Sequence, residues 1–93
     1  MRDWKRGPLP VDYSQSELVP ENKWDVQEIS ICRNALTSSG LKDRMELQSV
    51  SVTKDKGSKF YFFKRPKVFG ATYVIQLNSV THEIIGRYFL PDG

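Results

Sequence analysis

Cys32 and His82 are the single cysteine and the single histidine of this chain, and together they could supply a nucleophile and its general base. Such a pair works only when the two side chains lie within hydrogen-bond reach. Cys32 falls on the apolar stripe of an expected helix, whereas His82 falls in an expected turn far away along the sheet. We therefore expect no enzymatic activity, and we assign Cys32 to the core and His82 to the turn.

The residues that could hold a metal or a cofactor are also few. One cysteine cannot form a zinc site alone, and His82 and Glu83 are neighbours in an extended segment, so their side chains point to opposite faces. Gly57, Gly70 and Gly86 are isolated, and none belongs to a glycine-rich phosphate loop. The sequence therefore predicts neither a metal nor a cofactor.

The strongest local signal is the segment 54–70, which reads KDKGSKFYFFKRPKVFG. It holds six of the fourteen Lys and Arg residues, one acid and five of the eleven aromatic rings. Aromatic rings flanked by cations can bind single-stranded nucleic acid, because bases stack on the rings while the cations contact phosphates. The same composition suits a surface that binds another protein, or a core strand whose lysines protect the sheet edge from aggregation. In the core interpretation, Phe60 and Phe62 face the helix, and Tyr61 and Phe63 cover the other sheet face or contact the N-terminal arm.

The bulk composition restricts the class of protein. The 93 residues are enough for one domain with a small core, and the net charge of +3 is too mild to indicate nucleic acid by itself. The lone cysteine excludes an intrachain disulfide, and no stretch reaches the roughly 18 apolar residues of a membrane span. We therefore expect a soluble protein, either cytoplasmic or exported without disulfides.

The chain divides into an extended N-terminal arm, residues 1–21, and one α+β domain, residues 22–93. Three prolines favour extended backbone in the arm, whose apolar residues leave open whether it packs on the domain or docks on a partner. A helix is expected over residues 23–38, with Asn22 as its N-cap and Gly40 in a left-handed conformation after it. The apolar side of this helix comprises Ile29, Cys32 and Leu36, with Val26 and Ala35 beside them. Its polar side includes Gln27, Glu28, Ser30 and Arg33.

Beyond the helix, the period of the apolar residues changes to two, which is typical of strands. The alternation changes phase between Leu47 and Val50, which predicts a β-bulge near Gln48 or Ser49. A turn at residues 55–57 contains a glycine where a positive φ is needed. The four expected strands cover about residues 45–52, 59–65, 71–78 and 83–90. They can pair as an antiparallel meander with the helix on one face.

Two stretches match motifs of known families. Residues 72–89, TYVIQLNSVTHEIIGRYF, look like a closing hairpin whose turn reads D-x-x-T-G-E-I. The matching residues are Asn78, Thr81, Glu83 and Ile84. His82 replaces the glycine of this turn, at a position that needs a left-handed backbone. Residues 48–52, QSVSV, match a Q-x-V-x-G hairpin up to its glycine, which is Val52 here.

The first hairpin belongs to PepSY-type domains and the second to cystatin inhibitors of cysteine proteases. The chain therefore resembles the cystatin-like superfamily, to which both families belong. The resemblance implies one helix on an antiparallel meander. Val52 disfavours the tight inhibitory loop, because a valine does not adopt the backbone conformation that glycine provides there.

We therefore expect an α+β fold, with one helix packed on a four-stranded antiparallel β-meander and an extended N-terminal arm. The expected function is a non-catalytic protein-binding or inhibitory module that uses the exposed sheet face and the basic aromatic loop. The alternative is a single-stranded nucleic-acid-binding domain that uses the aromatic and basic strand 59–67. A homodimer through an edge strand is also compatible with the sequence. The predicted contact residues are Trp4, Tyr61, Phe63, Lys64, Arg65 and Lys67.

Overall fold

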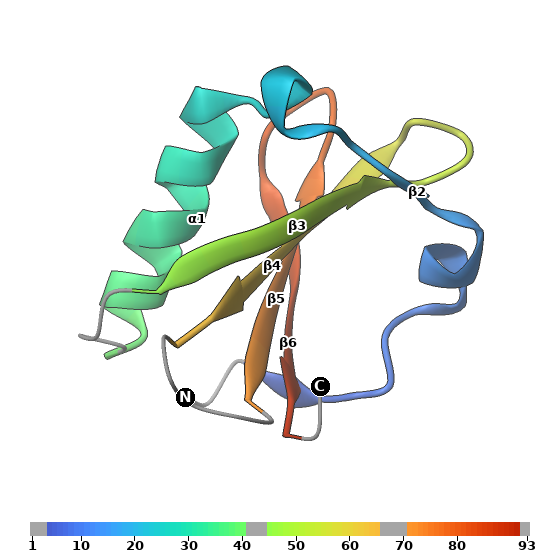
Figure 1. The fold of residues 1–93 in the computed structure, drawn as a ribbon. Coiled ribbons are helices and arrows are strands. Elements are labelled where there is room, and N and C mark those ends of the chain that lie inside the picture. The colour runs from blue at the N-terminus through green and yellow to red at the C-terminus, as the bar shows by residue number, and fades with distance from the viewer. Residues whose placement is uncertain (1–3, 41–44, 66–70, 92–93) are drawn as a thin grey trace.

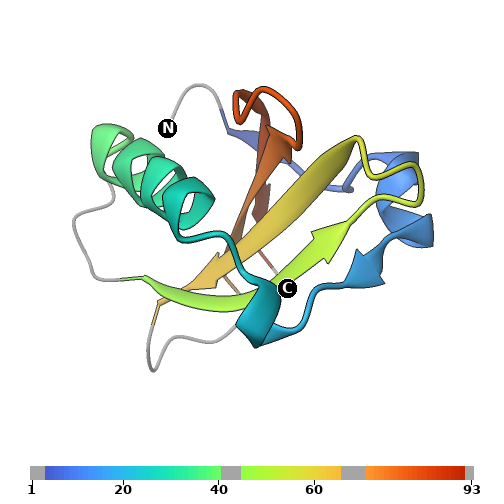
Figure 2. The same cartoon turned by 90° about the horizontal axis from the view of Figure 1, so that it is seen from above.

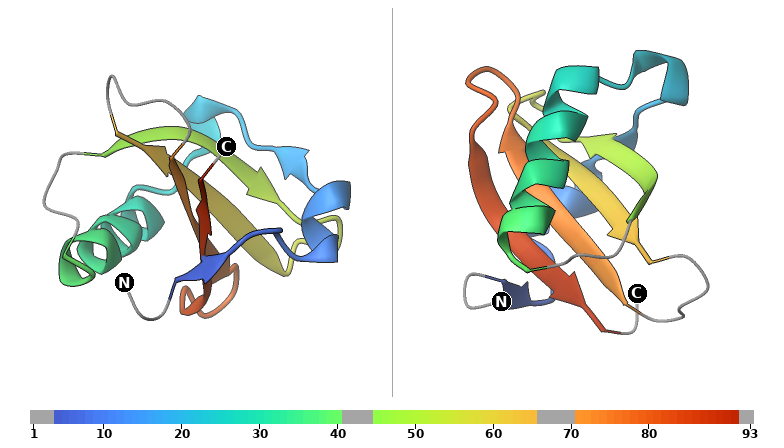
Figure 3. Two further views of the ribbon diagram at one scale, coloured as in Figure 1. Left: turned by 90° about the horizontal axis from the view of Figure 1, so that it is seen from below. Right: turned by 90° about the vertical axis from the view of Figure 1, so that its left-hand side faces the viewer.

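The computed structural model describes residues 4–40, 45–65 and 71–91. It shows an α+β fold in which one helix packs on one face of a twisted sheet (Figures 1 and 3). None of the helices in these ranges has the length and apolar character that a membrane crossing requires.

Helix α1, Val26–Ser38, begins one turn later than predicted. Its N-cap is Asp25, whose carboxylate accepts hydrogen bonds from the amides of Gln27 and Glu28. The predicted cap, Asn22, instead lies in the short 3-10 helix η2, Glu21–Lys23. The extended backbone of Trp24 separates the two helices, so Asn22 cannot cap α1. Gly40 has a φ of +86°, which confirms the predicted left-handed conformation.

Four long strands form the antiparallel meander at the centre of the sheet. They are β3 (Glu46–Val52), β4 (Ser58–Lys64), β5 (Thr72–Asn78) and β6 (Ile84–Leu90). The register of β3 on β4 shifts between Leu47 and Ser49, which confirms the predicted β-bulge at Gln48. A second bulge inserts Ile85 between the paired residues Ile84 and Gly86 of β6.

The N-terminal arm adds one strand at each edge, so the sheet has six strands instead of the predicted four. β1 (Lys5–Arg6) pairs in parallel with β6, and β2 (Glu17–Leu18) pairs antiparallel with β3. The strand order is β1-β6-β5-β4-β3-β2. Between these strands, the 3-10 helix η1 (Val11–Gln15) lies on the opposite side of the sheet from α1 (Figure 2). Strands of two residues carry no alternation, and therefore the sequence pattern cannot predict them.

Because α1 covers one face and the arm covers the other, the sheet buries side chains on both. The helix-side cluster consists of Trp4, Cys32, Leu36, Met45, Val50, Tyr61, Phe63, Tyr73, Ile75 and Leu77. The arm-side cluster consists of Phe60, Val74 and Tyr88, with Leu9, Tyr13, Phe62 and Leu90 packed against it. The prediction that Phe60 and Phe62 face the helix is therefore wrong, since Tyr61 and Phe63 do so. Residues 60–63 are all aromatic, so the sequence does not show which of them point to the helix side of the sheet.

Candidate functional site

The structure places three predicted contact residues in the core. Trp4 is buried, its Nε1 donates a hydrogen bond to Oγ of Ser39 at 3.0 Å, and its ring packs edge-on against Tyr73. Tyr61 and Phe63 are fully buried on the helix side. The prediction that these rings form an exposed contact face is therefore wrong, because the helix and the arm cover both faces of the sheet.

The other predicted contact residues are cations near the end of β4. Lys64 and Arg65 are half-buried, and Lys67 lies outside the described residues. The five predicted contact residues that the structure describes therefore do not form one surface. Contacts of Lys64 and Arg65 with a partner stay a prediction.

The sheet edges are only partly covered by the arm. β2 pairs only with Ser51 and Val52 of β3. The bulge at Gln48 therefore lies on the part of β3 that is not paired with β2. At the other edge, β1 pairs with Tyr88 and Phe89 of β6, and the bulge at Ile85 lies on the part of β6 that is not paired with β1. Bulges hinder the pairing of edge strands between molecules, and a homodimer through an edge strand stays a prediction without support.

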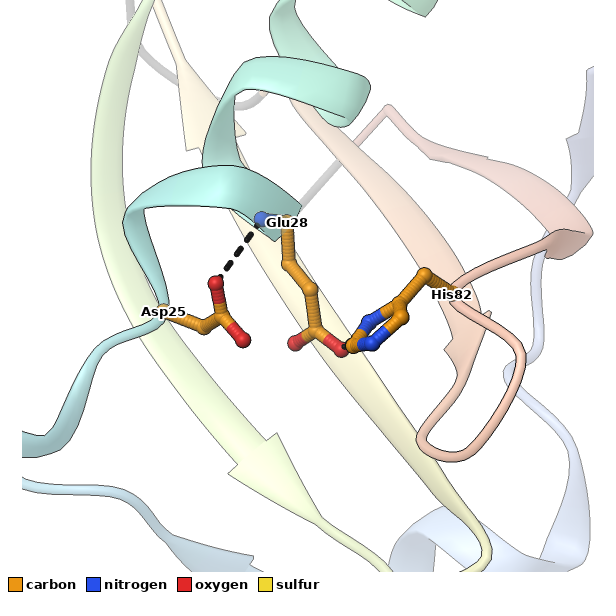
Figure 4. A group of neighbouring side chains, drawn as sticks. All are labelled: Asp25, Glu28 and His82. Carbon is orange, nitrogen blue, oxygen red and sulfur yellow. Dashed lines mark hydrogen bonds and ion pairs between the residues drawn. The ribbon is translucent and has the colours of Figure 1, made fainter.

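A charged network lies beneath the first turn of α1, on the side that the sequence predicted to be polar. Glu28 is 0% exposed. Its Oε1 accepts hydrogen bonds from the hydroxyl of Tyr61 and from Nζ of Lys59 at 3.1 Å, both on β4. Its Oε2 lies 2.7 Å from Nδ1 of His82 (Figure 4). A buried carboxylate needs such partners, because an unpaired buried charge is very costly.

The assignment of Glu28 to the polar side of the helix is therefore wrong. Glu28, Cys32 and Leu36 are the three buried residues of α1, and they follow one another at intervals of four. Ile29 and Ala35, which were expected in the core, are only half-buried, and Val26, which was expected beside them, is 80% exposed. Arg33 is exposed as expected. This interval of four is visible in the sequence, but a glutamate is seldom fully buried, so residue type favours the polar side for Glu28.

His82 reaches this network from the turn between β5 and β6. Its φ is +63°, which agrees with the left-handed conformation that the resemblance implies at this position. Oδ1 of Asn78 accepts hydrogen bonds from the amides of Val80 and Thr81 and so holds the turn. The expectation that His82 lies far from Cys32 is wrong, because the turn contacts α1 at Glu28, one helical turn before Cys32.

Two side chains beside Glu28, namely Cys32 and Tyr61, have raised pKa values. Burial, and then the negative charge of Glu28, raise the pKa of the Cys32 thiol to about 12. At neutral pH Cys32 is therefore a thiol, which is a poor nucleophile. Burial and the hydrogen bond to Glu28 also raise the pKa of the Tyr61 hydroxyl, which therefore stays a proton donor. The side chains of Lys59 and His82 are 23% and 37% exposed, so solvent reaches the network only at its rim.

Asp25, Glu28 and His82 also offer ligand atoms that lie within 4.8 Å of one another, as a cation site would (Figure 4). However, the ammonium group of Lys59 already lies 3.1 Å from Glu28. A metal cation at this carboxylate would be repelled by the ammonium group. The arrangement therefore suits the Lys59–Glu28 ion pair with its surrounding hydrogen bonds better than a metal site.

A second rigid turn, between β3 and β4, lies beside the turn of His82. Asp55 accepts hydrogen bonds from the hydroxyl of Thr53 at 2.6 Å and from the amide of Gly57 at 2.8 Å, and these bonds hold the pKa of Asp55 below its ordinary value. Lys56, and not Gly57 as predicted, has a positive φ of +62°. The amide of Ser79 donates to the carbonyl of Gly57 at 3.0 Å, which joins the two turns.

We refer to residues 53–58 and 78–83 as the two-turn end. The Q-x-V-x-G-like stretch, residues 48–52, is not part of it, since it lies within β3 and its Val50 is buried. No protein-family model, no curated protein and no solved structure matches this chain. A function for the chain must therefore be inferred from the geometry of the two-turn end and the network beneath it.

Proposed function

We propose that this chain is a non-catalytic module that binds another protein through the two-turn end. The observation that supports this proposal is the position of Val80, which is 80% exposed at the tip of a turn fixed by hydrogen bonds. Apolar anchors that insert into a partner's pocket supply much of the energy of protein interfaces. A fixed turn loses little conformational freedom on binding, which favours affinity.

The buried network gives this turn its rigidity. His82 ties the turn to α1 through Glu28, and Ser79 ties it to the neighbouring turn through Gly57. Neither contact leaves a reactive group that faces a cleft, and the Cys32 thiol is buried and protonated. In this proposal the network positions a recognition loop and does no chemistry.

The nucleic-acid alternative has less support. Phe60, Tyr61 and Phe63 are fully buried, and Phe62 packs against Tyr13 of the arm, so the strand offers bases no open stacking platform. Membership of the cystatin-like superfamily is likewise a proposal. The order of helix and meander and the left-handed His82 support it.

The proposal is tested with Val80→Asp and the matched control Val26→Asp. Both valines are 80% exposed, but Val26 is the first residue of α1 and lies outside the two-turn end. Each protein is immobilised, proteins bound from an extract of the source cells are quantified by mass spectrometry, and the candidates are purified for calorimetry. We expect at least one partner whose affinity falls about tenfold or more with Val80→Asp and is unchanged with Val26→Asp.

If every bound protein binds Val80→Asp as well as it binds the wild type, the proposal is wrong. Circular dichroism of both variants verifies that the fold is retained. Micromolar binding of mixed-sequence single-stranded oligonucleotides that disappears at moderate salt would favour the nucleic-acid alternative instead.

A further inference from the structure

The N-terminal arm is held at both edges and on both faces of the sheet (Figure 3). Trp4 is buried in the helix-side cluster, and Leu9 and Tyr13 pack on the opposite face. At the far edge, the amide of Val19 donates a hydrogen bond to the carbonyl of Val50 at 2.7 Å. Each of these contacts joins the arm to the α+β domain, and each would form equally well with the arm of a second copy of the chain.

The middle of the arm fills a site for one aromatic ring. The centroid of the Tyr13 ring lies 5.3 Å from that of Phe60 and 5.4 Å from that of Phe62. The contact with Phe60 is edge-on, which is a favourable arrangement of two aromatic rings. This face of the sheet is therefore complete only when an arm supplies Tyr13.

The connection between the arm and α1 is a short, exposed hinge. Glu21, Asn22 and Lys23 of η2 are all exposed, and the backbone is extended at Pro20 and at Trp24 on either side. The amide of Lys23 donates to the carbonyl of Pro20 at 2.8 Å, and the amide of Trp24 donates to that of Glu21 at 3.1 Å. Straightening the hinge breaks these two bonds and takes no side chain of η2 out of the core, since none is buried there.

The contacts on either side of the hinge are regained when two copies exchange arms. Nε1 of Trp24 donates a hydrogen bond to the carbonyl of Val19 at 3.0 Å, and Glu17 pairs with Lys56 at 3.7 Å. In an exchanged pair, the Val19 and Glu17 of one copy would make these contacts with the Trp24 and Lys56 of the other. The exchanged and closed forms therefore differ mainly in the shape of the hinge.

We propose that two copies of this chain exchange their N-terminal arms, so that Tyr13 of each copy covers Phe60 of the other. Exchange of identical segments gives a closed dimer with twofold symmetry. The chain's own arm competes with the second copy at an effective concentration on the order of millimolar, because the hinge is short. The single chain is therefore the main form in dilute solution, and the dimer forms when chains fold at high concentration.

This inference goes beyond the proposed function, because it concerns the arm and the sheet face beneath it rather than the two-turn end. The exchanged dimer carries Val80 twice. A partner that presents two matching sites would then bind the dimer more tightly than the single chain without any new contact.

The first measurement is the oligomeric state after refolding. The wild type is unfolded in urea and refolded at about 5 µM and at about 500 µM, and the molar mass is determined by size-exclusion chromatography with light scattering. We expect monomer at the lower concentration and about a fifth or more of the chains in dimers at the higher one, which approaches the effective concentration of the arm.

Lys23→Pro tests the hinge. Proline removes the amide that donates to Pro20 and disfavours helical backbone at Asn22, so it straightens the connection. We expect it to raise the dimer fraction at about 500 µM at least about twofold, because the closed form loses the turn that it needs. Lys23→Ala keeps the amide and should behave as the wild type. Circular dichroism verifies that both variants fold.

The second measurement shows which copy supplies each arm. Unlabelled and nitrogen-15-labelled chains are mixed, unfolded and refolded together at about 500 µM, and a carbodiimide then joins Glu17 to Lys56, whose charged groups lie 3.7 Å apart. By mass spectrometry, about half of the joined peptides from the dimer should combine a labelled with an unlabelled segment, as random pairing of two copies requires. In the monomer both segments should carry the same label.

Absence of a dimer from both the wild type and Lys23→Pro would overturn the proposal. A dimer whose joined Glu17–Lys56 peptides carry a single label would also overturn it, because its arms are closed and its contact lies elsewhere. Equal dimer fractions in Lys23→Pro and Lys23→Ala would contradict the role of the hinge and overturn it as well. Val80→Asp should dimerise as the wild type does, so failure of the exchange is distinguishable from failure of the proposed contact at Val80.

Discussion

Glu28 and His82 are 54 positions apart in the sequence, yet Oε2 of Glu28 lies 2.7 Å from Nδ1 of His82. The same carboxylate also accepts hydrogen bonds from Lys59 and Tyr61 in the middle of the sheet. One buried side chain therefore links α1, β4 and the β5–β6 turn. The stability of these three elements should depend on it.

Glu28→Ala should lower the free energy of unfolding by about 3–5 kcal/mol, because it leaves Lys59 and His82 without their buried partner. Urea denaturation followed by circular dichroism measures this loss. Glu21→Ala, at an exposed glutamate of η2, is the control and should change the free energy of unfolding by less than about 0.5 kcal/mol. A loss of under about 1 kcal/mol for Glu28→Ala would show that the network does not hold the fold together.

The left-handed backbone of His82 can be separated from its contact with Glu28 by two substitutions. His82→Ala and His82→Gly both remove the contact with Glu28, but only alanine keeps a Cβ at a φ of +63°. That conformation costs an L-residue about 1–2 kcal/mol. We expect His82→Ala to be less stable than His82→Gly by about 1 kcal/mol in urea denaturation. Equal stability would mean that the turn relaxes when the histidine is lost.

Alkaline pH should destabilise the protein through Cys32. The pKa of its thiol is raised from 9.0 to about 12 in the folded state, so between these pH values the folded chain keeps a proton that the unfolded chain releases. The stabilisation is complete below about pH 9 and falls by about 1.4 kcal/mol per pH unit as the pH rises toward about 12. The raised pKa of Tyr61 acts in the same direction above about pH 10.

The measurement compares urea denaturation at about pH 8.5 and about pH 10.5 for the wild type and Cys32→Ala. Lysines and tyrosines titrate in both proteins, so the difference between the two slopes isolates the thiol. We expect the slope of Cys32→Ala to be smaller by about one proton. Identical slopes would show that Cys32 ionises equally in the folded and unfolded chains.

Trp4→Ala should release the N-terminal arm from the α+β domain. The substitution removes a buried indole, its hydrogen bond to Ser39 and its contact with Tyr73, and should cost about 3–5 kcal/mol. Cleavage by chymotrypsin after Tyr13, followed by mass spectrometry, should become about tenfold faster or more. Val11→Ala, at an exposed valine, is the control. If cleavage stays as slow as in the wild type, the other contacts of the arm, namely the pairing of β1 and β2 and the packing of Tyr13, are sufficient to hold it.

The features that the sequence predicted correctly are local. Apolar periodicity located α1 and the four long strands, the change of phase located the bulge at Gln48, and Gly40 marked the end of α1. Each of these signals lies within a few residues of the structure that it specifies. The start of α1 is not evident from the sequence, because Asn22 and Asp25 are both favourable N-cap residues. The extended backbone of Trp24 excludes Asn22 as the cap of α1.

The features that the sequence did not predict depend on distant residues. The burial of Glu28 requires Lys59, Tyr61 and His82, which are 31 to 54 positions away. The two faces of the aromatic strand are distinguished only by what packs on each, namely α1 over Tyr61 and the arm over Phe60. The pattern of apolar and polar residues along the sequence does not specify these long-range contacts.

The arm passes around the sheet, from Trp4 in the helix-side cluster, past Tyr13 on the opposite face, to Val19 against the helix side again. Its strands pair with β6 and β3, which leave the ribosome later than the arm does. The arm is synthesised before both of these strands, so it can reach its place only after they are present, and closing so long a loop is slow. Until then the ring of Phe60 faces water, so a newly made chain passes through an interval in which its aromatic sheet face is open to aggregation.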